Sequence, residues 1–175
     1  MKFYSLDVET ANPDQSAICQ IGVGIFEDGE LVDTWSSYID PQDYFHWRFI
    51  DIHGITPKMV KRKPTFPKVY PLLREMFENN IVIHHSPFDR IAFQKVFDKY
   101  GLDPFEVQWL DSVRVARHTW KEFSDGGYNL AHVAYRLGID FQHHDALEDS
   151  ITAGKIVLKA CNIHGIQVHE WIQRF

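Results

Sequence analysis

The stretch Phe3-Tyr-Ser-Leu-Asp-Val-Glu9 mixes β-forming residues with two acids and predicts the first strand of a sheet. Apolar stretches at 17–26 and 34–39 predict two more strands, and Asp28-Gly29 between them is a strong hairpin signal. The chain therefore begins with three consecutive strands, which we expect to form an antiparallel meander.

The remainder of the chain alternates between helical and strand patterns. Apolar residues at helical spacing predict helices at 67–78, 88–100, 113–118, 130–137 and 146–160. Short apolar runs at 81–83 and 107–110 predict two more strands. A meander followed by this alternation is typical of an α/β fold with a mixed five-stranded sheet, antiparallel in its first three strands and parallel afterwards, flanked by helices.

The composition is that of a soluble globular domain. The chain has 175 residues, 45% hydrophobic and 24% charged, without a repeat or linker, so we expect one domain over 1–175. No apolar run could form a membrane helix, the N-terminus does not resemble a signal peptide, and Cys19 and Cys161 have no zinc or disulfide spacing. These features argue against a membrane protein, a secreted disulfide scaffold and a zinc finger, and predict a cytoplasmic location.

Two carboxylates lie close together on the first predicted strand. Asp7 and Glu9 are two residues apart and therefore point to the same face, whereas Val8 points to the other. Side by side they repel each other, and a divalent cation would relieve the repulsion. The alternative is an edge strand whose acids face water.

The net charge of −6 argues against a basic nucleic-acid coat protein but is compatible with a metal-dependent enzyme.

A third acid opens the helix predicted at 88–100. Pro87 suits a first helical turn and Ser86 can cap it, so Asp89 would lie in the first turn, near the end of the preceding strand. Asp89 could equally do no more than complement the helix dipole.

A fourth acid lies near the start of the longest predicted helix. Asp145 and Glu148 form a pair typical of a capping box, which places the helix start near 146 and Asp149 one turn inside. His144 precedes the helix on a loop, where an imidazole can act as a general base. Helix capping beside an unrelated loop histidine is the alternative.

Taken in order, three segments resemble the exonuclease motifs of the DEDDh (DnaQ-like) family, which includes the epsilon proofreading subunit of bacterial DNA polymerase III and its stand-alone relatives. They are Asp7-Val-Glu-Thr10, His84-His-Ser-Pro-Phe-Asp89 and His144-Asp-Ala-Leu-Glu-Asp149. The resemblance runs from Asp7 to about residue 160 and includes Ile52-His-Gly-Ile-Thr56. The step from His144 to Asp149 matches the family, whereas His143 is out of register. Family members usually carry Asn at the position of His85, which puts a supporting hydrogen bond in doubt.

The resemblance implies a ribonuclease H-like fold and two Mg²⁺ or Mn²⁺ ions per site, ~3.5–4 Å apart. By carry-over, Asp7 would bridge both ions, Glu9 and Asp149 would complete the shell of the first, and Asp89 would hold the second. His144 would take the proton from the attacking water. Carboxylate oxygens without a nearby cysteine independently favour Mg²⁺ or Mn²⁺ over zinc.

The same resemblance implies 3′→5′ hydrolysis of single strands or frayed ends and release of nucleoside 5′-monophosphates. We expect DNA as the substrate, with RNA as the alternative, because the motifs do not reveal contacts to a 2′-hydroxyl. Thr10, Ala11 and His53 would lie near the terminal nucleotide. The motifs occupy about 3–160, and the apolar residues in the tail 161–175 suffice to pack on the domain, on a polymerase partner or on a second copy in a homodimer. Two other functions stay open: a ribonuclease H-like endonuclease, and a non-catalytic module that binds nucleic-acid ends.

Two further features have more than one interpretation each. The cluster Tyr44-Phe-His-Trp47 could stack bases, pack in the core or form a loop lid. The basic run between 58 and 74 could be a solvated loop or a track for phosphates.

Overall fold

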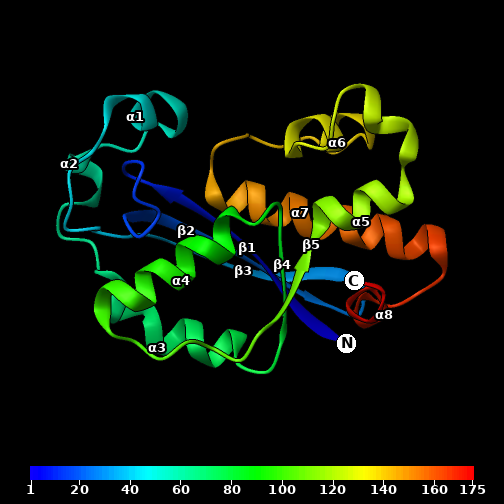
Figure 1. The fold of residues 1–175 in the computed structure, drawn as a ribbon, viewed down its shortest axis with the longest axis horizontal. Coiled ribbons are helices and arrows are strands. Elements are labelled where there is room, and N and C mark those ends of the chain that lie inside the picture. The colour runs from blue at the N-terminus through cyan, green and yellow to red at the C-terminus, as the bar shows by residue number, and fades with distance from the viewer.

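The computed structural model describes all residues from Met1 to Phe175 and contains one five-stranded sheet with the strand order β3-β2-β1-β4-β5 (Figure 1). The strands are β1 (Lys2–Thr10), β2 (Ile18–Glu27), β3 (Glu30–Tyr38), β4 (Ile81–His84) and β5 (Gln108–Asp111). The first three pair antiparallel, whereas β4 is parallel to β1 and β5 is parallel to β4. The predicted ribonuclease H-like mixed sheet is therefore confirmed.

The hairpin between β2 and β3 forms at the predicted dipeptide. Asp28 and Gly29 both have positive φ angles, 51° and 88°. Two such residues form the tight turn that suits the twist of paired strands. The turn sets the register, in which Glu27 pairs with Glu30.

Eight α-helices and one 3₁₀-helix at Lys121–Asp125 complete the fold. The α-helices are α1 (Trp47–His53), α2 (Pro57–Val60), α3 (Phe66–Phe77), α4 (Phe88–Tyr100), α5 (Ser112–Thr119), α6 (Leu130–Arg136), α7 (Ala146–His164) and α8 (Val168–Arg174). The sequence predicted α3 to α7 within a few residues but missed α1, α2 and α8. Helix α1 buries none of its residues, so it lacks the apolar periodicity that identifies a packed helix.

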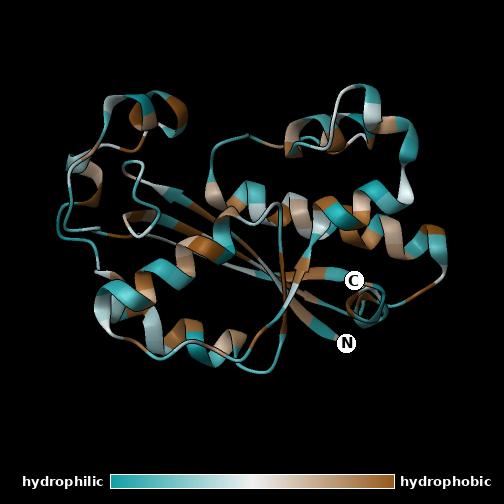
Figure 2. Cartoon of the chain, in the orientation of Figure 1, coloured by the Kyte–Doolittle hydropathy of each residue, from teal (hydrophilic) through white to brown (hydrophobic).

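The two faces of the sheet carry separate hydrophobic cores. Leu6 and Val8 of β1 belong to the core under α3 and α4, whereas Phe3 belongs to the core under α5, α6 and α7. Figure 1 shows these two groups of helices on either side of the sheet, and Figure 2 shows brown, apolar segments along the strands between them. Residues 3, 5, 7 and 9 alternate with 4, 6 and 8, so Asp7 and Glu9 continue the face of β1 that α7 covers.

The C-terminal tail lies against the second of these cores. Val168 and Trp171 of α8 are buried and join the core under α7. None of the helices is both long and apolar enough to cross a membrane.

Candidate active site

The end of β1 supplies the first two acids. Asp7 pairs with Gly22 of β2 in the sheet register, and Glu9 pairs with Gln20. Both carboxylates are partly exposed, whereas Val8 between them is buried in the opposite core. The strand therefore presents two acids at the edge of the hydrophobic face instead of in open water.

The first turn of α4 supplies the third acid. Asp89 is 2% exposed, and its Oδ1 accepts a hydrogen bond of 3.1 Å from the backbone N–H of Val8. The chain enters α4 through Ser86, which has a positive φ of 86°, a strained conformation of the kind found at functional sites. This strained turn and the bond to β1 hold Asp89 beside Asp7 and Glu9.

The first turn of α7 supplies the fourth acid, and two features of β2 let the helix approach. A Cβ on Gly22 would lie 2.2 Å from the backbone carbonyl of Ala146, so only glycine admits α7 at this distance. The Gln20 amide donates to Asp145 and accepts from the N–H of Ala146. Asp145 caps the helix by accepting from its first N–H groups, and Asp149 one turn later is 4% exposed.

The four acids converge around one hollow of about 330 Å³, which Asp7, Glu9, Asp89 and Asp149 all line. Ligand oxygens of Asp7, Glu9 and Asp149 lie within 4.8 Å of one another. The four acids come from the strand β1 and from two helices, α4 and α7, which lie on opposite faces of the sheet. The structure thus brings together the four acids that the sequence singled out.

Burial raises the pKa of each of these carboxyl groups. The pKa of Asp7 lies well above its usual range because of burial and then of the charge on Asp89. Burial raises the pKa values of Glu9 and Asp89 to about 8 each. The pKa of Asp149 is also raised by burial, although a hydrogen bond from His143 opposes the change. Near neutral pH the charged forms of these four carboxyl groups are therefore disfavoured, and nearby cations would favour them.

The donor set fits divalent metal ions of the hard type. Asp7, Glu9 and Asp149 form one group of possible ligands, Asp89 lines the same hollow, all four offer carboxylate oxygens, and neither cysteine lines that hollow. Such oxygens suit Mg²⁺ or Mn²⁺, and the raised pKa values show that the protein alone does not compensate the charges.

Two adjacent histidines border the fourth acid. His143 Nδ1 lies 3.1 Å from both carboxylate oxygens of Asp149, and the His144 backbone N–H donates to Asp149 at 3.2 Å. The two rings stack with their centroids 3.8 Å apart, and His144 has a positive φ of 68°. Burial and the neighbouring His143 lower the pKa of His144, so its ring is neutral near pH 7. The sequence pointed to His144 but set His143 aside.

A model of the exonuclease family (RNase_T) matches residues 5–157, a range that contains all four acids and both histidines. The chain belongs to this family. Its recognition as a DnaQ-like 3′→5′ exonuclease, predicted from the three motifs, is confirmed.

The exonuclease is also similar to parts of much longer proteins. It is 32% identical over 165 residues to the PolC-type DNA polymerase III of Thermotoga petrophila. The aligned region covers 90% of this chain and 12% of that protein. The PolC-type polymerase of Clostridium perfringens is 28% identical over 160 residues, covering 89% of this chain and 11% of that protein. The chain spans about an eighth of the length of these curated relatives.

Solved exonuclease structures share the fold of this exonuclease. Exonuclease X in complex with 5′-overhanging duplex DNA superimposes with a TM-score of 0.76 at 21% identity and covers 98% of both chains. The nuclease domain of 3′hExo, a DEDDh family member bound to rAMP, gives a TM-score of 0.76 at 20% identity and covers 93% of this chain and 92% of its own.

The residues predicted near the terminal nucleotide lie next to the acids in this exonuclease, but their side chains are engaged or buried. Thr10 and Ala11 are 2% and 0% exposed, main chain included, and both polar main-chain atoms of Ala11 are hydrogen-bonded within the protein. His53 Nε2 donates to the Thr10 carbonyl at 3.1 Å, and its Nδ1 accepts from the N–H of Ile55. Both ring nitrogens of His53 are therefore occupied in this conformation, and only the face of its ring is left for a further contact.

His85, the departure from the family pattern, makes two hydrogen bonds of its own. Its Nδ1 lies 2.7 Å from the Ser112 hydroxyl, and its Nε2 donates to the Tyr128 carbonyl at 2.9 Å. Burial lowers the pKa of His85 to about 4, so the imidazole is neutral near pH 7. The imidazole therefore supplies its own connections between β4, α5 and the segment before α6.

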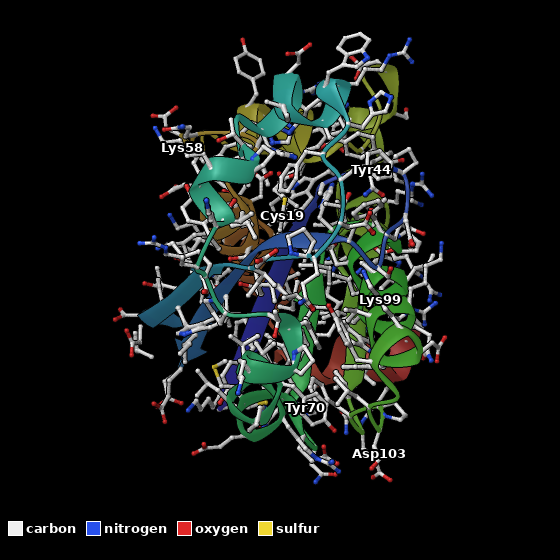
Figure 3. All side chains as sticks on the ribbon, turned by 90° about the vertical axis from the view of Figure 1, so that its left-hand side faces the viewer. Cys19, Tyr44, Lys58, Tyr70, Lys99 and Asp103 are labelled. Atoms are coloured by element: carbon white, nitrogen blue, oxygen red, sulfur yellow. The ribbon has the colours of Figure 1, made fainter.

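The aromatic cluster is divided between the surface and a small core, because Phe45 packs against the core that contains Ala11 and Ile55. Tyr44 and Trp47 are each 61% exposed, and the backbone N–H of His46 donates to the Ala11 carbonyl at 2.9 Å. Figure 3 looks onto this side of the molecule, where α1 and α2 and the labelled Tyr44 and Lys58 lie.

Proposed function

We propose that the chain removes nucleotides one at a time from the 3′ end of single-stranded or frayed DNA and releases nucleoside 5′-monophosphates. The observation that carries the proposal is the meeting of four carboxylates from three separate elements beside a neutral histidine. The exonuclease family to which the chain belongs supports the reaction class. The two hollows beside the acids leave room for a nucleic-acid strand.

In this proposal the carboxylates hold two divalent ions. Asp7 would contact both, Glu9 and Asp149 would complete the shell of one, and Asp89 would contribute to the other. When bound, such ions polarise the scissile phosphate and lower the pKa of water.

The histidine in this proposal moves the proton. His144 is neutral near pH 7 because burial and His143 disfavour its charged form, and it lines the same hollow as the acids. A neutral imidazole can accept the proton of the attacking water and pass it to solvent. His143 lies on Asp149 and would keep that carboxylate oriented.

The relatives support DNA over RNA in this proposal. Those reported above are DNA polymerases by name, and one structural neighbour was solved on DNA, whereas another was solved with rAMP. The PolC-type relatives contain a similar segment within a polymerase, so a replicative polymerase is the partner we propose, with a homodimer as the alternative.

Degradation of matched labelled oligonucleotides tests the function. Purified protein with Mg²⁺ or Mn²⁺ should release mononucleotides from single-stranded DNA faster than from RNA, and EDTA should abolish the release. Nicking of closed circular DNA would indicate an endonuclease instead, and binding of 3′ ends without any metal-dependent release would indicate a non-catalytic module.

A further inference from the structure

A second hollow, of about 430 Å³, borders the carboxylates on the side of α5 and α6. It shares Asp7, Asp149 and His143 with the hollow that contains Glu9 and Asp89, so Asp7 and Asp149 lie between the two hollows. Its size falls within the ~300–1,000 Å³ of typical ligand sites. A strand bound at Asp7 and Asp149 can therefore extend into both hollows.

The two hollows differ in charge. Arg117 lines the α5 side, and its guanidinium carbon lies 5.6 Å from the centroid of the Tyr128 ring. The Tyr128 hydroxyl donates to the Trp120 carbonyl at 2.8 Å, which fixes the ring beneath the guanidinium. No Lys or Arg lines the hollow on the α1 side. A permanent cation therefore borders only one of the two.

His85 gives the hollow with Arg117 its shape. The ring joins the Ser112 hydroxyl at the start of α5 to the Tyr128 carbonyl. Arg117 lies later on α5, and Asn129, which lines the same hollow, follows Tyr128 directly. The imidazole thus fixes the two walls of the hollow relative to each other.

We propose that this hollow binds the nucleotide on the 5′ side of the scissile phosphate, and that Arg117 binds the phosphate of that nucleotide. The inference rests on the proposed exonuclease function and adds its substrate contacts. The 3′-terminal nucleotide carries only the scissile phosphate, which the acids and their ions would hold, so its hollow needs no cation. The next nucleotide carries a further phosphate, and a guanidinium matches it in charge and geometry.

Two substrates that differ in this nucleotide test the inference. The p-nitrophenyl ester of thymidine 5′-monophosphate has the scissile phosphate but no second nucleotide, whereas the tetranucleotide dT4 has both. For Arg117→Ala we expect the KM for dT4 to rise about tenfold at little changed kcat, because one charged contact is lost. Hydrolysis of the ester should stay within about twofold of wild type, and Arg117→Lys should recover part of the dT4 affinity.

Lys155→Ala is the control, because it removes the same charge from an exposed position on α7 outside both hollows. Equal losses on ester and dT4 in Arg117→Ala would show that Arg117 acts through the acids, and would overturn the inference. So would an unchanged KM for dT4, or an equal effect of Lys155→Ala.

Binding of fluorescent dT4, measured by anisotropy with Ca²⁺, separates this inference from the proposed function. Arg117→Ala should weaken binding about tenfold and lower the slope of log affinity against log salt by about 0.7, the value for one phosphate contact on a single strand. This result is expected even of a protein that cleaves nothing. A wild type that hydrolyses neither substrate would refute the function, whereas equal binding by both proteins would refute the subsite.

Discussion

Helices α4 and α7 each bring a buried aspartate to the same end of the sheet, but they do so from opposite faces and by different means. Asp89 accepts from the backbone of β1 at Val8, a contact that cannot move without the sheet. Asp149 is contacted instead by His143 and by the backbone of His144, which lie on the loop before α7. One half of the site is thus fixed by a strand and the other by a loop that carries the proposed base.

The two helices also differ in how they sit on the sheet. Helix α4 packs through Ala92, Phe93 and Val96 against apolar side chains, which can adjust to small changes. The start of α7 lies backbone to backbone on β2 at Gly22, where there is no side chain to adjust. The half of the site that carries the proposed base on its loop therefore has the less tolerant contact with the sheet.

Replacing the loop histidines should have the largest effect. His144→Ala should lower kcat by about 10²–10⁴-fold, the usual contribution of a general base, and leave Mn²⁺ affinity by calorimetry nearly unchanged. His143→Ala should cost less than about tenfold, because it removes an orienting contact to Asp149 and not the proton acceptor.

A larger loss of kcat in His143→Ala than in His144→Ala would assign the role of general base to His143. A loss of Mn²⁺ affinity in His144→Ala as severe as its loss of rate would instead show that His144 holds the metal.

The sequence predicted the sheet and the four acids because both rest on local patterns. Alternation on β1 places Asp7 and Glu9 on one face, and capping signals place Asp89 and Asp149 in first turns. The role of Gly22 could not be predicted in the same way, because it depends on a helix 124 residues further along the chain. A glycine opposite Asp7 in the strand register would have been the only available signal.

His143 was missed for a related reason. The spacing from His144 to Asp149 fits the family motif, but a left-handed residue at 144 turns the loop so that His143 also reaches Asp149. Backbone conformation of this kind at a non-glycine residue is rarely visible in a sequence.

Helix α1 was not predicted because none of its residues is buried, although its Ile52 lines the hollow with the acids.

A side chain at Gly22, where the start of α7 contacts β2, should have an intermediate effect. Gly22→Ala puts a methyl group 2.2 Å from the Ala146 backbone, so the start of α7 must move, at a cost of about 3 kcal/mol in the free energy of unfolding. Because Asp149 moves with the helix, Mn²⁺ affinity should fall as well. Urea denaturation and calorimetry measure the two effects.

Gly24→Ala is the matched control on the same strand and face. Its methyl group would meet the Ser5 hydroxyl and the Phe26 ring, which are side chains and can shift. We expect it to lower stability without a specific loss of Mn²⁺ affinity. Equal losses of Mn²⁺ affinity in Gly22→Ala and Gly24→Ala would contradict the assignment of Gly22 as the contact that positions α7.

The smallest effect is the pH dependence of stability in the metal-free protein. The folded-state pKa values of Glu9 and Asp89, about 8, lie above those of the unfolded chain, so the folded state binds more protons between about pH 4 and pH 8. Their contribution is therefore fully present below pH 4 and is lost as the pH rises to 8. Between pH 6 and 8 in EDTA we expect Tm to fall by about 4 °C, or roughly 1–2 kcal/mol after discounting for the partial exposure of Glu9. Excess Mn²⁺ should reverse the fall at pH 8, because it binds the ionised acids of the folded state only. A Tm that rises over this interval without metal, or that Mn²⁺ leaves unchanged, would mean that the acids from α4, α7 and β1 do not form one charged cluster.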